Sequence, residues 1–86
     1  MPEEPAQIHE AIQILRRIAE DTGVPRNIRR ACSESIEILL DQSMSVGLRA
    51  ANAIPRLDEI SMDPNAPQYA RTAIWQAIAL LEQIRD

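Results

Sequence analysis

The sequence predicts an all-α protein, an antiparallel up-and-down four-helix bundle built from two similar helical hairpins. Three observations predict this fold. Apolar residues recur at spacings of three and four in four segments that turn residues separate, which is the pattern of amphipathic helices. No stretch alternates apolar and polar residues, so a sheet is not expected. The pattern of the first half also recurs in the second half, where Leu57 takes the place of Leu15 and Pro67 that of Pro25.

The first two helices are predicted at about residues 5–20 and 25–41. Pro5 suits a first helical turn, and Gly23 can end the first helix in a left-handed conformation. The apolar stripe of the first helix consists of Ile8, Ala11, Ile12, Leu15, Ile18 and Ala19. The stripe of the second consists of Ile28, Ala31, Cys32, Ser35, Ile36 and Leu39. Within it, the Ser35 hydroxyl is expected to bond the carbonyl of Ala31.

The other two helices are predicted at about residues 46–61 and 67–85. Ser45 is the expected N-cap of the third helix. Pro55 lies inside this helix, on the side opposite its apolar stripe, and should bend one continuous helix around the core. The stripe of the third helix consists of Val46, Ala50, Ala53, Ile54, Leu57 and Ile60. That of the fourth consists of Ala70, Ala73, Ile74, Ala77, Ile78, Leu81 and Ile84.

The internal repeat, which matches Leu15 with Leu57, relates one helical hairpin to the other, and we call it the hairpin repeat. The chain of 86 residues suffices for one domain spanning 1–86. Two helices per repeat also occur in HEAT-like hairpin stacks, which are the alternative fold. Such stacks usually need at least three repeats, whereas two hairpins can close on each other. The bundle is therefore favoured.

Composition excludes several classes of function. The chain has only two glycines, so a glycine-rich phosphate-binding loop is excluded. The single cysteine cannot form an internal disulfide, and no apolar run approaches the length of a membrane span. The acidic N-terminus is not followed by the apolar stretch of a signal peptide, so a cytoplasmic location without a membrane partner is expected.

No enzyme constellation is found, and we expect no catalytic, metal-binding or cofactor-binding residue. His9 is the only histidine, and no second histidine or cysteine is available to complete a zinc site. Cys32 lies in the middle of an apolar stripe, where a free cysteine behaves as a small hydrophobe. The neighbouring carboxylates Asp58 and Glu59 point about 100° apart on a helix and do not converge.

Arginine is unevenly placed: residues 16–30 hold five of the nine arginines and two acids. The up-and-down topology places Arg26, Arg29 and Arg30 at one pole of the bundle, where they could bind an anion such as an RNA backbone. Alternatively, these arginines pair with the acids of the same pole, which are Glu20, Asp21, Asp58, Glu59 and Asp63. Internal pairing is favoured, because the chain has a net charge of -4 and no lysine.

Trp75 lies at the rim of its stripe, one turn after Arg71. It could close the core edge through a cation–π contact, or it could anchor an interface, where tryptophan and arginine are enriched. We predict a non-enzymatic protein-interaction module with an unknown protein partner, whose surface is Arg26, Arg29, Arg30, Arg71 and Trp75. The alternative is an anion- or RNA-binding adaptor that uses the same arginines. A homodimer would help so short a chain, through apolar residues such as Leu40, Tyr69 or Leu80.

Four stretches resemble the signature of a small archaeal family, uncharacterised protein family 0147: Asp21 to Ala31 (DTGVPRNIRRA), Leu48 to Ile54 (LRAANAI), Leu57 to Pro67 (LDEISMDPNAP) and Ala70 to Trp75 (ARTAIW). The resemblance covers nearly the whole chain. It implies an up-and-down four-helix bundle and a cytoplasmic archaeal protein, but it implies no activity and no site residues. Pro55 departs from the family pattern, which prefers a small residue there, and this puts the smoothness of the third helix in question.

Overall fold

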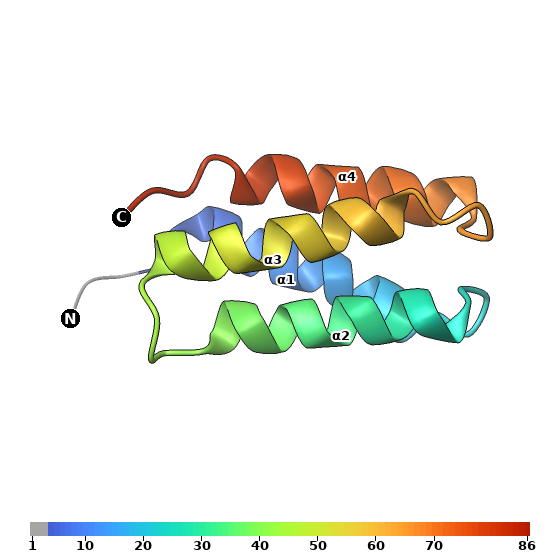
Figure 1. The fold of residues 1–86 in the computed structure, drawn as a ribbon, viewed down its shortest axis with the longest axis horizontal. Coiled ribbons are helices and arrows are strands. Elements are labelled where there is room, and N and C mark those ends of the chain that lie inside the picture. The colour runs from blue at the N-terminus through green and yellow to red at the C-terminus, as the bar shows by residue number, and fades with distance from the viewer. Residues whose placement is uncertain (1–3) are drawn as a thin grey trace.

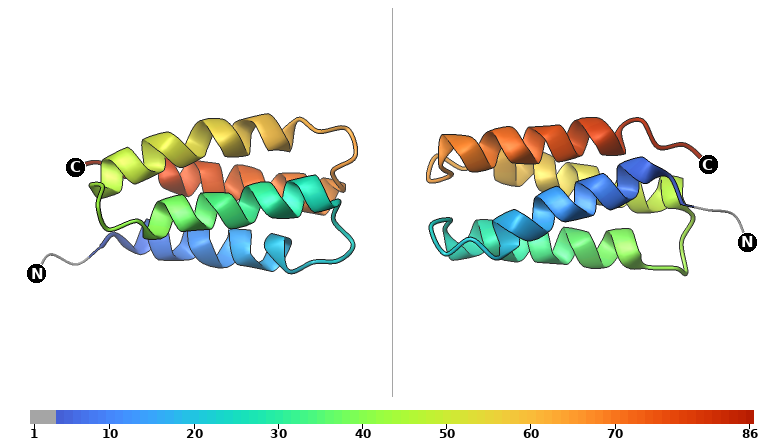
Figure 2. Two further views of the ribbon diagram at one scale, coloured as in Figure 1. Left: turned by 60° about the horizontal axis from the view of Figure 1, so that its bottom comes forward. Right: turned by 180° about the vertical axis from the view of Figure 1, so that it is seen from behind.

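The computed structural model describes residues 4–86, which form four α-helices and measure about 40 × 18 × 17 Å (Figure 1). The helices are α1 (Ala6–Ala19), α2 (Arg26–Leu40), α3 (Val46–Ser61) and α4 (Gln68–Leu81). Each helix packs against its two neighbours in a ring, because α1 contacts α4 as well as α2, and α3 contacts both α2 and α4. Figure 2 shows the four antiparallel rods from two further sides. The closed ring confirms the bundle over the open HEAT-like stack.

Prolines precede three of the helices and define where these helices begin. Pro5, Pro25 and Pro67 are N-caps with extended ψ values of 143–148°, so each helix starts one residue later than the sequence suggested. Their carbonyls accept the first helical hydrogen bonds, as Pro5 does from the Ile8 amide at 3.1 Å. Ser45 caps α3 as predicted, because its hydroxyl accepts from the Leu48 amide at 3.3 Å.

The predicted conformation of Gly23 and the predicted end of the fourth helix are wrong. Gly23 is not left-handed: no residue among 4–86 has a positive φ, and Asp21 closes the turn by accepting from the Gly23 amide at 2.8 Å. The fourth helix ends at Leu81 rather than near residue 85. Beyond it the chain tightens into turns that bury Ile84 and bring the Asp86 side chain to the start of α3. There the Asp86 carboxylate accepts from the Gly47 amide at 2.7 Å.

The core is built from the predicted stripes, and aliphatic residues fill it. The buried residues of α2 are the six that the sequence indicated, and the hydroxyl of Ser35 donates to the Ala31 carbonyl at 2.8 Å as expected. In α3 the prediction was less accurate. Arg49 and Ser61 are buried, whereas Val46, Ile54 and Ile60 are only partly buried. Pro55 is exposed on a single continuous helix, as predicted.

Candidate functional site

Each of the three loops between helices is folded by an aspartate at its beginning. Asp21 accepts from the Gly23 amide at 2.8 Å, Asp41 from the Ser43 amide at 2.9 Å, and Asp63 from the Asn65 amide at 2.8 Å. Each aspartate thus bonds the backbone two residues further on, which is the Asx-turn arrangement. The same chemistry therefore folds all three connections.

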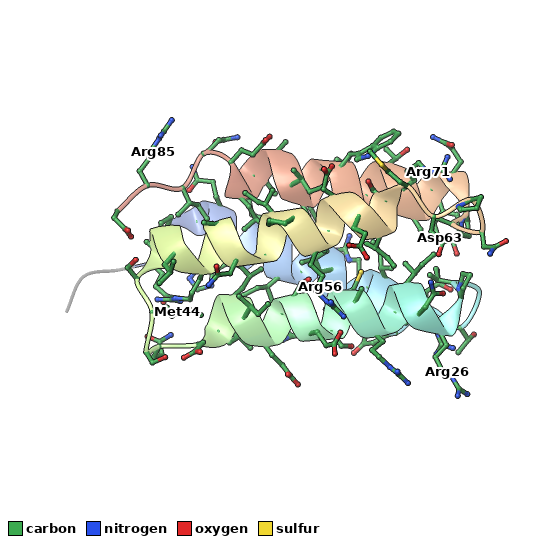
Figure 3. All side chains as sticks on the ribbon, viewed as in Figure 1. Arg26, Met44, Arg56, Asp63, Arg71 and Arg85 are labelled. Carbon is green, nitrogen blue, oxygen red and sulfur yellow. The ribbon has the colours of Figure 1, made fainter. Side chains whose placement is uncertain are left out.

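An arginine eight residues after each of these aspartates bonds the carbonyls of the same connection. Arg29 Nε donates to the Val24 carbonyl at 2.9 Å and Arg49 Nε to the Met44 carbonyl at 3.0 Å. Arg71 Nε donates to the Ser61 carbonyl at 3.0 Å and its Nη2 to the Asp63 carbonyl at 3.1 Å. Each guanidinium satisfies loop or helix-end carbonyls that have no helical partner. Figure 3 shows Arg71 beside Asp63 at the end of the bundle.

Arg49 is the most deeply placed of these arginines, with only 4% of its surface exposed. Besides the Met44 carbonyl, its guanidinium reaches the Leu39 carbonyl at 3.1 Å and the Glu4 carboxylate at 2.7 Å. The Arg49 hydrogen bond is also the largest cause that lowers the pKa of Glu4. Apolar periodicity missed this residue, although the Asp41–Arg49 spacing matches the Asp21–Arg29 spacing and could have indicated it.

The α1–α2 and α3–α4 loops meet at one pole, where they are joined by a reciprocal pair of hydrogen bonds. Asn27 Nδ2 donates to Asp63 and the Tyr69 hydroxyl donates to Asp21, both at 2.7 Å. In the hairpin repeat, the donor Asn27 is equivalent to the donor Tyr69, and the acceptor Asp21 is equivalent to the acceptor Asp63. These bonds and the Asx turns lower the pKa of both aspartates below their ordinary values, and the Asp21 carboxylate raises the pKa of Tyr69.

The expected ion pairs at this pole are not found. Within residues 4–86 the ion pairs are Arg49–Glu4 and Arg56–Glu34, and neither lies between the end loops. The acids Asp21 and Asp63 instead bond amides and neutral side chains, because the end-loop carbonyls already occupy Arg29 and Arg71. The prediction that the pole arginines form ion pairs with the acids of this pole is therefore wrong. These acids are Glu20, Asp21, Asp58, Glu59 and Asp63.

The five residues of the predicted interaction surface do not form one patch. Arg29 and Arg71 are half-buried in the loop contacts described above. Arg26 and Arg30 are exposed on α2, and Arg26 projects into solvent in Figure 3. Trp75 is 49% exposed. It lies one turn after Arg71, which reaches the end of α3, so Trp75 lies on the flank of α4 that faces α3.

An apolar stripe on the outward side of α3 was not predicted as a surface. Leu48, Ala51, Pro55 and Met62 recur at helical spacing and are all exposed, Leu48 at 48% and Met62 at 75%. We call these four residues the α3 outward stripe. Because Pro55 has no amide hydrogen, the Ala51 carbonyl on this face has no helical donor. The signal in the sequence was the additional apolar periodicity beside the core stripe.

The groups with catalytic potential are few and separate. Burial raises the pKa of the Cys32 thiol to about 12, so this group is neutral at physiological pH. His9 is exposed on α1. Among residues 4–86 there is no cluster of three or more His, Cys, Asp or Glu side chains that could hold a metal ion. In the same part of the chain, no helix has the length and apolar character needed to cross a membrane.

The fold and its loops define a small four-helix bundle whose connections are held by arginines, and comparison with known proteins gives its family. The profile of Uncharacterised protein family UPF0147 matches residues 1–84, so the chain belongs to this archaeal family of unknown function.

Several relatives and solved structures are similar over nearly the whole chain. The UPF0147 protein of Metallosphaera sedula is 53% identical over 94% of this chain and 91% of its own. That of Aeropyrum pernix is 57% identical over 88% and 84%. A crystal structure of the protein of unknown function MMP1188 aligns with a TM-score of 0.91 at 39% identity, covering 100% of this chain and 99% of the other. A UPF0147 structure from Thermoplasma acidophilum aligns with a TM-score of 0.87 at 31% identity, covering 93% and 94%.

Proposed function

We propose that this chain is a non-enzymatic protein-interaction module that binds a partner protein through the α3 outward stripe and Trp75. The exposed apolar face of α3 carries this proposal. A helix that packs its inner face into a core usually presents charged and polar residues on the other side. Here the outward side also exposes the apolar residues Leu48, Ala51, Pro55 and Met62, and exposed apolar surface is typical of interaction sites.

The neighbouring groups add specificity to this apolar surface. Trp75 places a large ring on the α3 flank of α4, and tryptophan is enriched among the residues that dominate binding energy. Asp58 and Glu59 are exposed in the turn between Pro55 and Met62 and supply charged groups beside these apolar residues. The carbonyl of Ala51 offers an acceptor inside the apolar surface. The partner is therefore a protein with an apolar patch and a hydrogen-bond donor or cation at its edge.

A photo-crosslinking experiment tests this function, and the hairpin repeat supplies its control. A photoreactive residue at Ala51 is compared with one at His9, the exposed equivalent of Ala51 in the first hairpin. Both proteins are irradiated in native extract with and without RNase, at low salt and at about 1 M salt, where the Debye length is about 3 Å. We expect one protein product from position 51 only, insensitive to RNase and salt and lost on Trp75→Ser.

The anion- or RNA-binding alternative gives a different result in the same experiment. The exposed Arg16, Arg17, Arg26 and Arg30 are outside the ion pairs of residues 4–86 and favour it. Crosslinking that depends on RNA, or that weakens steeply with salt, would replace the protein-partner proposal with this alternative. Equal crosslinking from positions 9 and 51 would contradict both the α3 surface and the role of Trp75.

A further inference from the structure

The outward face of α2 carries charges of opposite sign in its two halves. The residues at positions 26, 30, 34, 37 and 41 recur at spacings of four, four, three and four, which places them on one side of the helix. The structure confirms that this side faces solvent, since four of them are exposed and Glu34 is half-exposed. We call them the α2 outward stripe. In chain order they are Arg26, Arg30, Glu34, Glu37 and Asp41.

This arrangement opposes the helix dipole at both ends. Arg26 and Arg30 lie in the first turns of α2, where the dipole is positive, and Glu37 and Asp41 lie at its negative end. Among residues 4–86, Arg26 and Arg30 have no ion-pair partner. Glu37 and Asp41 have none in this part of the chain either. The hydrogen bonds from Ser43 lower the pKa of Asp41 and so favour its charged form. Within residues 4–86, these four charges therefore stand on one exposed helix outside any ion pair.

The spacing of these charges fits a two-fold axis. Arg26 and Asp41 lie equally far from the midpoint between Ser33 and Glu34, and so do Arg30 and Glu37. If two α2 helices pack antiparallel across this midpoint, both arginines of one copy face acids of the other copy, and the opposed dipoles attract. A two-fold interface needs such a self-complementary surface. Glu34 lies next to the axis, and its charge is already neutralised by Arg56 of its own chain.

A groove beside the stripe can receive the arginines. It lies between α2 and α3, has a volume of about 430 Å³, and is lined by Glu34, Glu37, Ile38, Asp41 and Arg56. Figure 3 shows Arg56 extending from α3 toward α2 at this position. This lining suits an arginine side chain. Its apolar stem can pack against Ile38 while its guanidinium pairs with the carboxylates of the groove.

From these observations we propose that the α2 outward stripe is a homodimer surface on which a second copy of this chain docks antiparallel, pairing Arg26 with Asp41 and Arg30 with Glu37 across a two-fold axis at Ser33–Glu34. The contacts across this interface are mainly ionic. The dimer therefore forms at low ionic strength and dissociates in high salt. The surface differs from the apolar face proposed for the partner protein, and either proposal can fail without the other.

Charge exchange between two variants tests this pairing. Arg30→Glu and Glu37→Arg each place like charges opposite each other in a homodimer, yet each improves the match to the helix dipole, so folding is retained. We expect either variant alone to dimerise at least about tenfold more weakly than the natural chain in sedimentation at low salt. Mixed in equal amounts they should form a heterodimer, because both pairs are then complementary. The double variant should dimerise alone.

The control exchanges charges outside the stripe. Glu82→Arg with Arg85→Glu reverses two exposed charges after α4 and should leave dimerisation unchanged. A natural chain that stays monomeric at low salt would overturn the proposal. So would single variants that dimerise as well as the natural chain, a mixture without heterodimer, or a control that weakens the dimer equally.

Discussion

The two hairpins of the bundle are alike inside and different outside. Leu15 and Leu57 are equivalent in the hairpin repeat and are both fully buried, as are Ala11 and Ala53. The outward residues have diverged. Where α2 carries arginines and acids, the equivalent positions of α4 carry only neutral residues, namely Gln68, Thr72, Gln76, Ala79 and Gln83.

Between the first and third helices, it is the second hairpin that has the more apolar outward residues. Leu48, Pro55 and Met62 of the second hairpin take the places of Ala6, Gln13 and Glu20 in the first. The two hairpins therefore share core positions such as Leu15 and Leu57, whereas these outward positions differ. The difference teaches that one hairpin offers an ionic face and the other an apolar face, which suits two contacts of different chemistry.

The largest effect is expected from matched truncations in the shared core. Leu15→Ala and Leu57→Ala each remove a fully buried side chain, so each should lower the free energy of unfolding by about 2–5 kcal/mol. Denaturant unfolding followed by circular dichroism measures both. The repeat predicts similar losses, and a loss at one position less than half of that at the other would show that the two hairpins do not contribute equally.

The arginines of the loops should have graded effects. Arg49→Met leaves the Leu39 and Met44 carbonyls without their donor deep in the structure, which should cost about 1–3 kcal/mol. Arg29→Met removes a single part-buried bond, to the Val24 carbonyl, and should cost about 1 kcal/mol or less. Arg85→Met is the exposed control. Equal losses for Arg29 and Arg49 would contradict a larger role for the more deeply buried Arg49.

The smallest effect concerns the reciprocal bonds at the pole and depends on pH. Because the folded pKa values of Asp21 and Asp63 lie below the ordinary 3.8, their stabilisation is present above that pH and is lost as pH falls through the folded values. The melting temperature of the natural chain should therefore fall below about pH 4.

Matched substitutions sharpen this prediction. Asp21→Asn and Asp63→Asn should each reduce the fall in melting temperature at acid pH by a similar amount. Part of this fall should remain in both variants, because the pKa values of Glu4 and Asp41 are also lowered. An unchanged profile in the double substitution would show that these carboxylates do not stabilise the pole.

Much of the fold could be predicted from the sequence, because polarity and helical spacing suffice to sort the core. The six buried residues of α2 and the Ser45 cap follow from local rules alone. Arg49 could not be placed in this way, because its burial depends on carbonyls and a carboxylate that only the folded chain brings together. The reciprocal bonds of Asn27 and Tyr69 likewise need two loops that are far apart in the sequence.

The candidate surfaces were predicted less well, since a linear pattern does not show which charges already have partners. Arg29 and Arg71 resemble Arg26 and Arg30 in the sequence, yet the first two bond loop carbonyls and the second two do not. The interaction surface thus needed the structure, which separates the arginines that hold the fold from those on the outward face of α2.

Exchanging residues between the hairpins tests most directly whether the two outward faces have separate roles. One variant gives α2 the residues of α4, Arg30→Thr with Glu37→Ala, and the other gives the second hairpin the residues of the first, Leu48→Ala with Trp75→Ser. Each is assayed for self-association by sedimentation and for partner capture by crosslinking from position 51. The account predicts that the first variant loses only self-association and the second only capture. Loss of both functions in either folded variant, or of neither in both, would contradict it.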